Sequence, residues 1–141
     1  MNLCTQVSGL RSQVFALLLL VALPYLSGLR HDFVYDDHGA IVENQFLQDT
    51  SHVRDVLSLR VLKDPRVLDG QRPVVILSYF LDRAMWGLKP FGYHLTNLIL
   101  HLGAVLALFA LLTLLRSAAP PFAVALLFGL HPVLAEAVQC P

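Results

Sequence analysis

Three stretches of the chain carry no Asp, Glu, Lys or Arg, and they determine the predicted architecture. They cover residues 12–29, 90–115 and 117–135, and each is rich in Leu, Ala, Val and Phe. A helix needs about 20 mostly apolar residues to cross a bilayer. The second stretch is longer than that, and the other two are close to it. We therefore predict an all-α membrane protein with about three transmembrane helices.

The first apolar stretch allows more than one interpretation. Arg11 precedes a short apolar run that ends at Pro24, which is also the pattern of a secretory signal peptide. The apolar character continues from Tyr25 to Leu29, and no clear Ala-x-Ala cleavage site follows. We therefore favour an uncleaved transmembrane anchor over residues 1–29, ahead of a cleaved signal peptide or a buried helix of a soluble protein.

The charged residues indicate how the chain is oriented. Arg11 precedes the first span, and Arg116 lies in the short segment between the second and third spans. Short basic segments stay in the cytoplasm under the positive-inside rule. Residues 30–92 then form a large extracytoplasmic loop, in which acidic and basic residues nearly cancel. Residues 93–141 hold two transmembrane helices joined by a Pro-containing turn, so these two helices are expected to pack antiparallel.

The composition agrees with a membrane setting and excludes several other classes of protein. Hydrophobic residues make up 56% of the chain and charged residues 14%, against about 25% charged residues in a typical soluble domain. The net charge of zero gives no hint of nucleic-acid binding. Cys4 and Cys140 stand at opposite ends of the chain, so no disulfide framework, metal motif or cofactor is expected.

The extracytoplasmic loop is predicted to carry short helices. An amphipathic helix is expected over residues 51–62, with Thr50 or Ser51 as its cap. A second, apolar helix is expected over residues 74–86, and it ends at Trp86. This helix is too short to span a bilayer, and Trp favours the headgroup level. We therefore predict an interfacial helix that lies on the membrane surface.

Two adjacent carboxylates, Asp36 and Asp37, follow an apolar triplet in the first part of the loop. Adjacent acids repel, so one of them can hold its proton more tightly than a free Asp and act as a general base. The run Asp-Asp-His-Gly at residues 36–39 also suits a plain solvated turn. Both interpretations stay open on residue types alone, and neither gives the pair an evident packing role.

A second group of polar residues lies at the outer ends of the predicted spans. His94, Asn97 and His101 fall within about 60° of one another on one helical face, and His131 and Glu136 lie at the end of the third stretch. Polar groups in a span usually face a bundle interior or a wet cavity. Hydrogen bonding between helices explains them without any chemistry. A haem or metal site on the histidines is a third alternative, although an i, i+7 pair is a poor chelate for one ion.

Four motifs carry a resemblance to a known family. They are Phe-Val-Tyr-Asp-Asp at residues 33–37 with Asn44, Arg-Pro-Val at 72–74, Gly-Tyr-His-Leu-Thr-Asn at 92–97 with His101, and Leu-Phe-Gly-Leu-His-Pro at 127–132 with Glu136. In this order, the chain resembles the N-terminal part of the GT-C-fold membrane glycosyltransferases. It most resembles the transmembrane and tetratricopeptide-repeat protein O-mannosyltransferases and their bacterial relatives. The resemblance covers roughly residues 33–138.

The resemblance implies a partial GT-C fold and a transfer reaction. A sugar such as mannose would move from a polyprenyl-phosphate donor to a protein Ser or Thr hydroxyl, or to another acceptor such as a glycan. Asp36 or Asp37 would be the catalytic base. Arg72 is the candidate for the donor phosphate, since a guanidinium matches phosphate geometry. The other polar residues would shape the substrate pocket, namely His94, Asn97, His101, His131 and Glu136.

The resemblance also implies a location and a larger protein. The bacterial inner membrane is the expected location, with the endoplasmic reticulum membrane as the alternative and the loop facing periplasm or lumen. Members of this family have more spans and a C-terminal array of helical repeats, so the chain is expected to be a fragment that is inactive alone. The alternative function is a small, non-enzymatic membrane protein that binds a partner.

Overall fold

In the computed structural model, the described residues form helices and contain no β-strand. The described residues are 3–34, 37–64, 67, 70–116 and 118–139, without the side chains of 3–8, 136, 137 and 139. The all-α class predicted from the sequence is confirmed for this part of the chain. It divides into two compact units, the first made of Met1–Arg30 and His94–Gln139 and the second of His31–Tyr93 and Cys140–Pro141.

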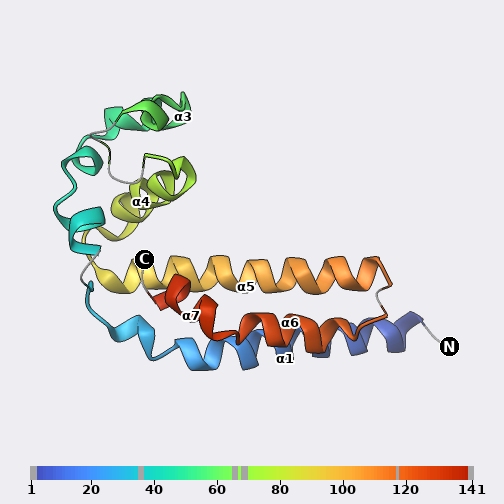
Figure 1. Ribbon diagram of the computed structural model, residues 1–141. Coiled ribbons are helices and arrows are strands. Elements are labelled where there is room, and N and C mark those ends of the chain that lie inside the picture. Colours follow the sequence, from blue (N-terminus) through green and yellow to red (C-terminus); the bar gives the residue numbers. More distant parts are fainter. Residues whose placement is uncertain (1–2, 35–36, 65–66, 68–69, 117, 140–141) are drawn as a thin grey trace. The chain divides into compact units, whose positions relative to one another are not determined.

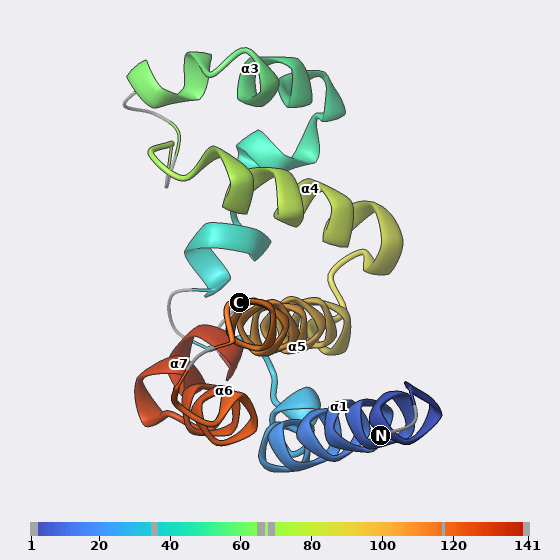
Figure 2. The same cartoon turned by 90° about the vertical axis from the view of Figure 1, so that its right-hand side faces the viewer.

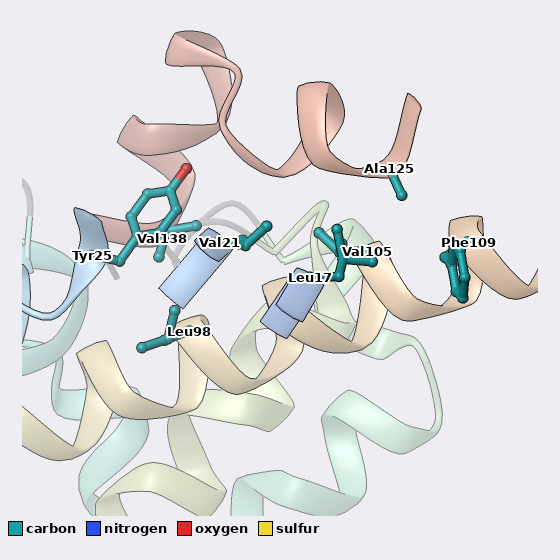
Figure 3. Packing of buried hydrophobic residues seen from close by; sticks show 8 residues of the cluster. All are labelled: Leu17, Val21, Tyr25, Leu98, Val105, Phe109, Ala125 and Val138. Atoms are coloured by element: carbon teal, nitrogen blue, oxygen red, sulfur yellow. The ribbon is translucent and has the colours of Figure 1, made fainter. Parts of the chain in front are cut away.

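The first unit is a bundle of apolar helices. It contains α1 (Leu3–Tyr25), α5 (Pro90–Leu114) from His94 onward, α6 (Pro121–Gly129) and α7 (Pro132–Gln139). As Figures 1 and 2 show, α5 runs antiparallel to both α1 and α6, as predicted for α5 and α6. Buried side chains from all four helices form one core (Figure 3): Leu17, Val21, Tyr25, Leu98, Val105, Phe109, Ala125 and Val138.

Helix α5 meets the requirements of a membrane span. It has 25 residues and a mean hydropathy of 2.2, and among the described helices it alone is long and apolar enough to cross a bilayer. Only 22% of its most apolar window is buried. Ile99, Leu100 and Leu114 are all more than half exposed. Exposed apolar side chains on a long helix are unfavourable in water and favourable in lipid. The apolar part of α1, Gly9–Tyr25, is shorter than a typical span.

The third apolar stretch differs from the prediction of one transmembrane helix. Helix α6 ends at Gly129, and a separate helix, α7, begins at Pro132. Proline has no N–H to donate, and its ring clashes with the carbonyl of the preceding turn. Pro132 can therefore start a helix but cannot continue one. The chain turns at Leu130 and His131, where the Leu130 N–H still bonds to the Leu126 carbonyl at 3.0 Å.

The second unit consists of short helical segments and α4 (Pro73–Trp86), which matches the helix predicted over residues 74–86. The segments are η2 (His38–Val42, a π-helix), η3 (Gln45–Gln48), η4 (Thr50–His52), α3 (Val53–Leu57) and η5 (Arg60–Lys63). Their apolar side chains form a core with those of α4: Leu47, Val56, Val61, Val67, Ile76 and Phe80.

The amphipathic helix predicted over residues 51–62 is shorter than expected. Helix α3 ends at Leu57, and Leu59 adopts a left-handed conformation with φ of 58° before η5 begins. The cap is also different, because the Asp49 carboxylate accepts the Ser51 backbone N–H at 2.8 Å. This hydrogen bond to the charged form lowers the pKa of Asp49 below its usual value.

Candidate functional site

Within the acidic pair, Asp36 lies outside the described residues, and Asp37 is a buried group. Its side chain is only 2% exposed. The carboxylate Oδ2 of Asp37 accepts the backbone N–H of Val34 at 2.8 Å, and the Asp37 N–H donates to the Val34 carbonyl at 2.7 Å. The expectation that the acidic pair has no packing role is therefore wrong for Asp37, whose carboxylate holds local backbone.

The segment that follows Asp37 is attached to α4. Nη1 of Arg83 donates to the backbone oxygen of Ile41 at 3.3 Å, and the Ile41 side chain is fully buried. Ile41 belongs to the π-helix η2, a rare element that is frequent at functional sites. A basic residue of α4 therefore holds the segment that carries the acidic motif.

Arg83 belongs to a small polar cluster. Asp82 beside it is buried, and Tyr93 lies within electrostatic reach of both Arg83 and Asp82. The Tyr93 hydroxyl donates to the Gly87 carbonyl at 2.9 Å, and its ring meets the ring of Phe33 edge-on at a centroid distance of 5.4 Å. Phe33 opens the acidic motif. Tyr93 thus connects the acidic motif to the start of α5, and Arg83 connects the segment after it to α4.

Arg72, the residue expected to bind a phosphate, lies at the opposite end of α4. Eleven positions separate Arg72 from Arg83, which corresponds to about 16 Å at a helical rise of 1.5 Å per residue. The exposed side chain of Arg72 lines a cavity of about 520 Å³, together with Lys63 and Asp64. The structure therefore places Arg72 about three helical turns from the point where the acidic segment contacts α4.

The polar residues of α5 lie in the first unit. His94 and His101 are buried, and Asn97 is half-buried. Nε2 of His101 bonds to the Gly129 carbonyl oxygen at 3.0 Å, and the Tyr25 hydroxyl donates to the same oxygen at 2.9 Å. A carbonyl oxygen can only accept, so the proton of this bond sits on Nε2 of His101. For His101, these bonds correspond to the interpretation in which polar groups join helices.

The remaining candidates lie in the last part of the chain. His131 is exposed in the break between α6 and α7, and its Nδ1 accepts the Val133 N–H at 3.3 Å. Glu136 is in α7, and its side chain lies outside the described residues. Where side chains are described, no three His, Cys, Asp or Glu residues gather to hold a metal ion. Asp37 and Arg72 belong to the second unit and His94 to the first, so the convergence of all candidates at one membrane face stays a prediction.

Comparison with curated proteins identifies relatives of this chain in several animals. It is 36% identical over 119 residues to protein O-mannosyl-transferase Tmtc1 of Drosophila melanogaster and 38% identical over 121 residues to protein O-mannosyl-transferase TMTC2 of Mus musculus. Each match covers 81% of this chain and 14% of the relative. This chain is similar to one part of the TMTC protein O-mannosyl-transferases. Protein O-mannosyl-transferase F38B6.6 of Caenorhabditis elegans is 31% identical over 138 residues, which is 92% of this chain and 20% of that protein.

The similarity to these relatives confirms the resemblance to the transmembrane and tetratricopeptide-repeat protein O-mannosyltransferases that the four motifs carry. The chain spans 13–20% of the length of the first curated relatives it matches. These relatives come from animals, so a bacterial inner membrane is not supported as the location. No family model matches the chain, and no solved structure matches it.

Proposed function

We propose that this chain contributes the acidic loop and the neighbouring membrane helices of a GT-C-type glycosyltransferase. The enzyme would move a sugar such as mannose from a polyprenyl-phosphate donor to a protein Ser or Thr hydroxyl. The observation that carries the proposal is the 38% identity to a protein O-mannosyl-transferase over 81% of the chain. The proposed location is the endoplasmic reticulum membrane, with about three spans, of which α5 is the clearest, and with residues 30–92 facing the lumen.

The proposed reaction is a displacement at the anomeric carbon of the sugar. A carboxylate takes the proton of the acceptor hydroxyl while the hydroxyl oxygen forms its bond to the anomeric carbon. The bond from that carbon to the phosphate oxygen breaks, and the electron pair leaves with the phosphate. A nearby cation stabilises the negative charge that develops on the leaving group. The reaction therefore needs one available carboxylate for the acceptor hydroxyl and one cation for the donor phosphate.

The burial of Asp37 gives the two residues of the acidic pair different proposed roles. Its carboxylate already accepts the Val34 N–H at 2.8 Å and is almost fully covered. We therefore assign the role of base to Asp36 and a positioning role to Asp37, which fixes the backbone beside the base. The pocket wall is still proposed to include His94, Asn97, His131 and Glu136. His101 was proposed with them, and its bond to the Gly129 carbonyl also serves helix packing.

Two arginines are candidates for the contact to the donor phosphate. Arg72 has an exposed guanidinium in a cavity that also contains Lys63, which suits a phosphate ligand. Arg83 is closer to the acidic segment, because it donates to Ile41. We retain Arg72 as the phosphate residue and assign Arg83 to the positioning of the acidic segment.

Substitution of the acidic residues in a full-length protein that carries this segment tests the proposal. Asp36→Asn is expected to abolish sugar transfer from a labelled lipid-linked donor to a Ser/Thr acceptor peptide, with normal expression. Asp32→Asn is the matched control, because Asp32 is an exposed carboxylate of the same loop, and it is expected to keep its activity. Full activity of Asp36→Asn would show that the base has been assigned to the wrong residue.

The same assay, together with thermal melting, separates the two arginines. Arg72→Gln is expected to raise KM for the lipid-linked donor with little change in thermal stability, because its side chain is exposed. Arg83→Gln is expected to lower the melting temperature, since it removes the bond to the Ile41 carbonyl. The reverse pattern would exchange the two assignments.

A further inference from the structure

Helix α4 has two apolar faces, and only one of them packs within the second unit. Ile76 and Phe80 are buried in the core of this unit. Val74, Leu81 and Met85 are 79%, 58% and 63% exposed. We refer to these three residues as the outer stripe of α4. A large apolar surface of this kind marks a site of interaction with a protein or a membrane.

The positions of these residues place the outer stripe on one side of the helix, with the half-buried Ser78 between Val74 and Leu81. At 100° per residue, Val74, Leu81 and Met85 fall within about 40° of one another around the helix axis. The centre of the stripe lies about 140° from the centre of Ile76 and Phe80. On an ordinary surface helix the face away from the core is charged or polar. Here that face carries three exposed apolar side chains, and exposure of such side chains to water is unfavourable.

The chain itself brings α4 close to a membrane. Helix α4 ends at Trp86, and α5 begins at Pro90 after only three connecting residues. Three extended residues reach about 11 Å at most. The 25 residues of α5 extend about 37 Å, which exceeds the hydrocarbon thickness of about 30 Å. The first turn of α5 therefore extends into the headgroup region, and the last turn of α4 lies near it.

We propose that the outer stripe of α4 contacts the acyl-chain boundary of a phospholipid bilayer. The proposal rests on α5 as a membrane span, which is part of the proposed function. The end of α4 fits this level of the membrane, because Trp86 and Lys89 combine an aromatic ring and a basic side chain that favour the interface. The sequence predicts an interfacial helix over residues 74–86, and the exposed stripe identifies which side of it faces lipid.

Site-specific labelling of the full chain in phosphatidylcholine liposomes tests the proposal. Cys4 and Cys140 are replaced by Ser, and an environment-sensitive fluorophore is attached to a single cysteine at Leu81. A label at Ile99 of α5 is the control for lipid, and a label at Ser58, exposed in the second unit, is the control for water. Each sample is quenched in turn by spin-labelled lipid and by aqueous iodide.

The label at Leu81 is expected to resemble the label at Ile99, with a blue-shifted emission that spin-labelled lipid quenches and iodide does not. Quenching of Leu81 by iodide as strong as that of Ser58 would overturn the proposal, provided that Ile99 remains in lipid. Protection of Leu81 from both quenchers would mean that protein covers the stripe, and this result also overturns the proposal. If spin-labelled lipid does not quench the label at Ile99, α5 is not a membrane span, and the proposal fails with it.

The native chain offers a check that needs no substitution. Trp86 is the single tryptophan of the sequence and stands at the membrane end of α4. Its fluorescence is expected to fall when brominated lipids replace ordinary lipids in the liposomes. Unchanged emission from Trp86 would contradict the placement of this end of α4 at the interface, even if the labelled variants fail to fold.

Discussion

The carbonyl oxygen of Gly129 accepts hydrogen bonds from two other helices, and loss of both is expected to cost more than the sum of the separate losses. The Tyr25 hydroxyl of α1 donates to it at 2.9 Å, and Nε2 of His101 on α5 bonds to it at 3.0 Å. Tyr25→Phe and His101→Phe remove one bond each and keep a ring in each place. Together with the double variant, they form a thermodynamic cycle.

The expected magnitudes follow from the position of Gly129 at the end of α6. The last carbonyls of a helix have no partner within the helix, so this oxygen depends on other groups. Each single variant leaves one donor in place, and a hydrogen bond between helices in a membrane contributes about 0.6 kcal/mol on average. The double variant leaves a buried carbonyl without either donor, which costs about 1–3 kcal/mol. We expect an interaction energy on the order of 1 kcal/mol.

The free energies of unfolding of the four proteins come from titration with sodium dodecyl sulfate in mixed micelles, followed by circular dichroism. His131→Asn is the matched control, because His131 is an exposed histidine of the same unit and Asn can still accept the Val133 N–H as a helix cap. It is expected to change stability by less than about 0.5 kcal/mol. If the two single losses add up to the double loss within about 0.3 kcal/mol, the two donors contribute independently of each other and the reasoning is refuted.

Two further predictions concern packing and topology. Gly129→Ala is expected to destabilise the bundle by about 1–3 kcal/mol, because the new Cβ would lie 2.7 Å from Cγ2 of Val21. Gly103→Ala is the control, because there is open space around Gly103, and it is expected to raise stability by about 0.5–1 kcal/mol. Equal effects of the two substitutions in the same titration would contradict the close approach of Gly129 to Val21. In sealed microsomes, an impermeant thiol reagent is expected to label a cysteine at Ala118 and to reach one at Gln48 only after permeabilisation. Labelling of Gln48 alone before permeabilisation would reverse the orientation.

The helices that the sequence predicts well are those with uninterrupted apolar runs. The helix expected over residues 74–86 is found as Pro73–Trp86, and the helix in the second apolar stretch is found as Pro90–Leu114. Hydrophobic periodicity fails at the third stretch, because hydropathy does not register the missing N–H of Pro132. It also fails at Leu59, since its left-handed backbone is not a preference of leucine.

The site could be predicted in residue types but not in contacts. The motifs pointed to Asp37, yet residue types reveal neither its burial nor the bond that its carboxylate accepts from the Val34 N–H. Arg83 was missed because its bond to Ile41 joins positions 42 residues apart. A signal existed, since Asp82 and Arg83 interrupt an apolar run, and charged groups among apolar residues are costly unless paired or hydrogen-bonded.

The bond between Tyr25 and Gly129 also sets an order of events during synthesis. Its acceptor follows its donor by 104 residues, and ribosomes add about 5–20 residues per second. Gly129 is therefore synthesised about 5–20 s after Tyr25. During that interval α1 must remain beside the growing chain while the loop and α5 are completed. A signal peptidase that cut after α1 within those seconds would leave α6 to assemble without one of its two hydrogen-bond donors.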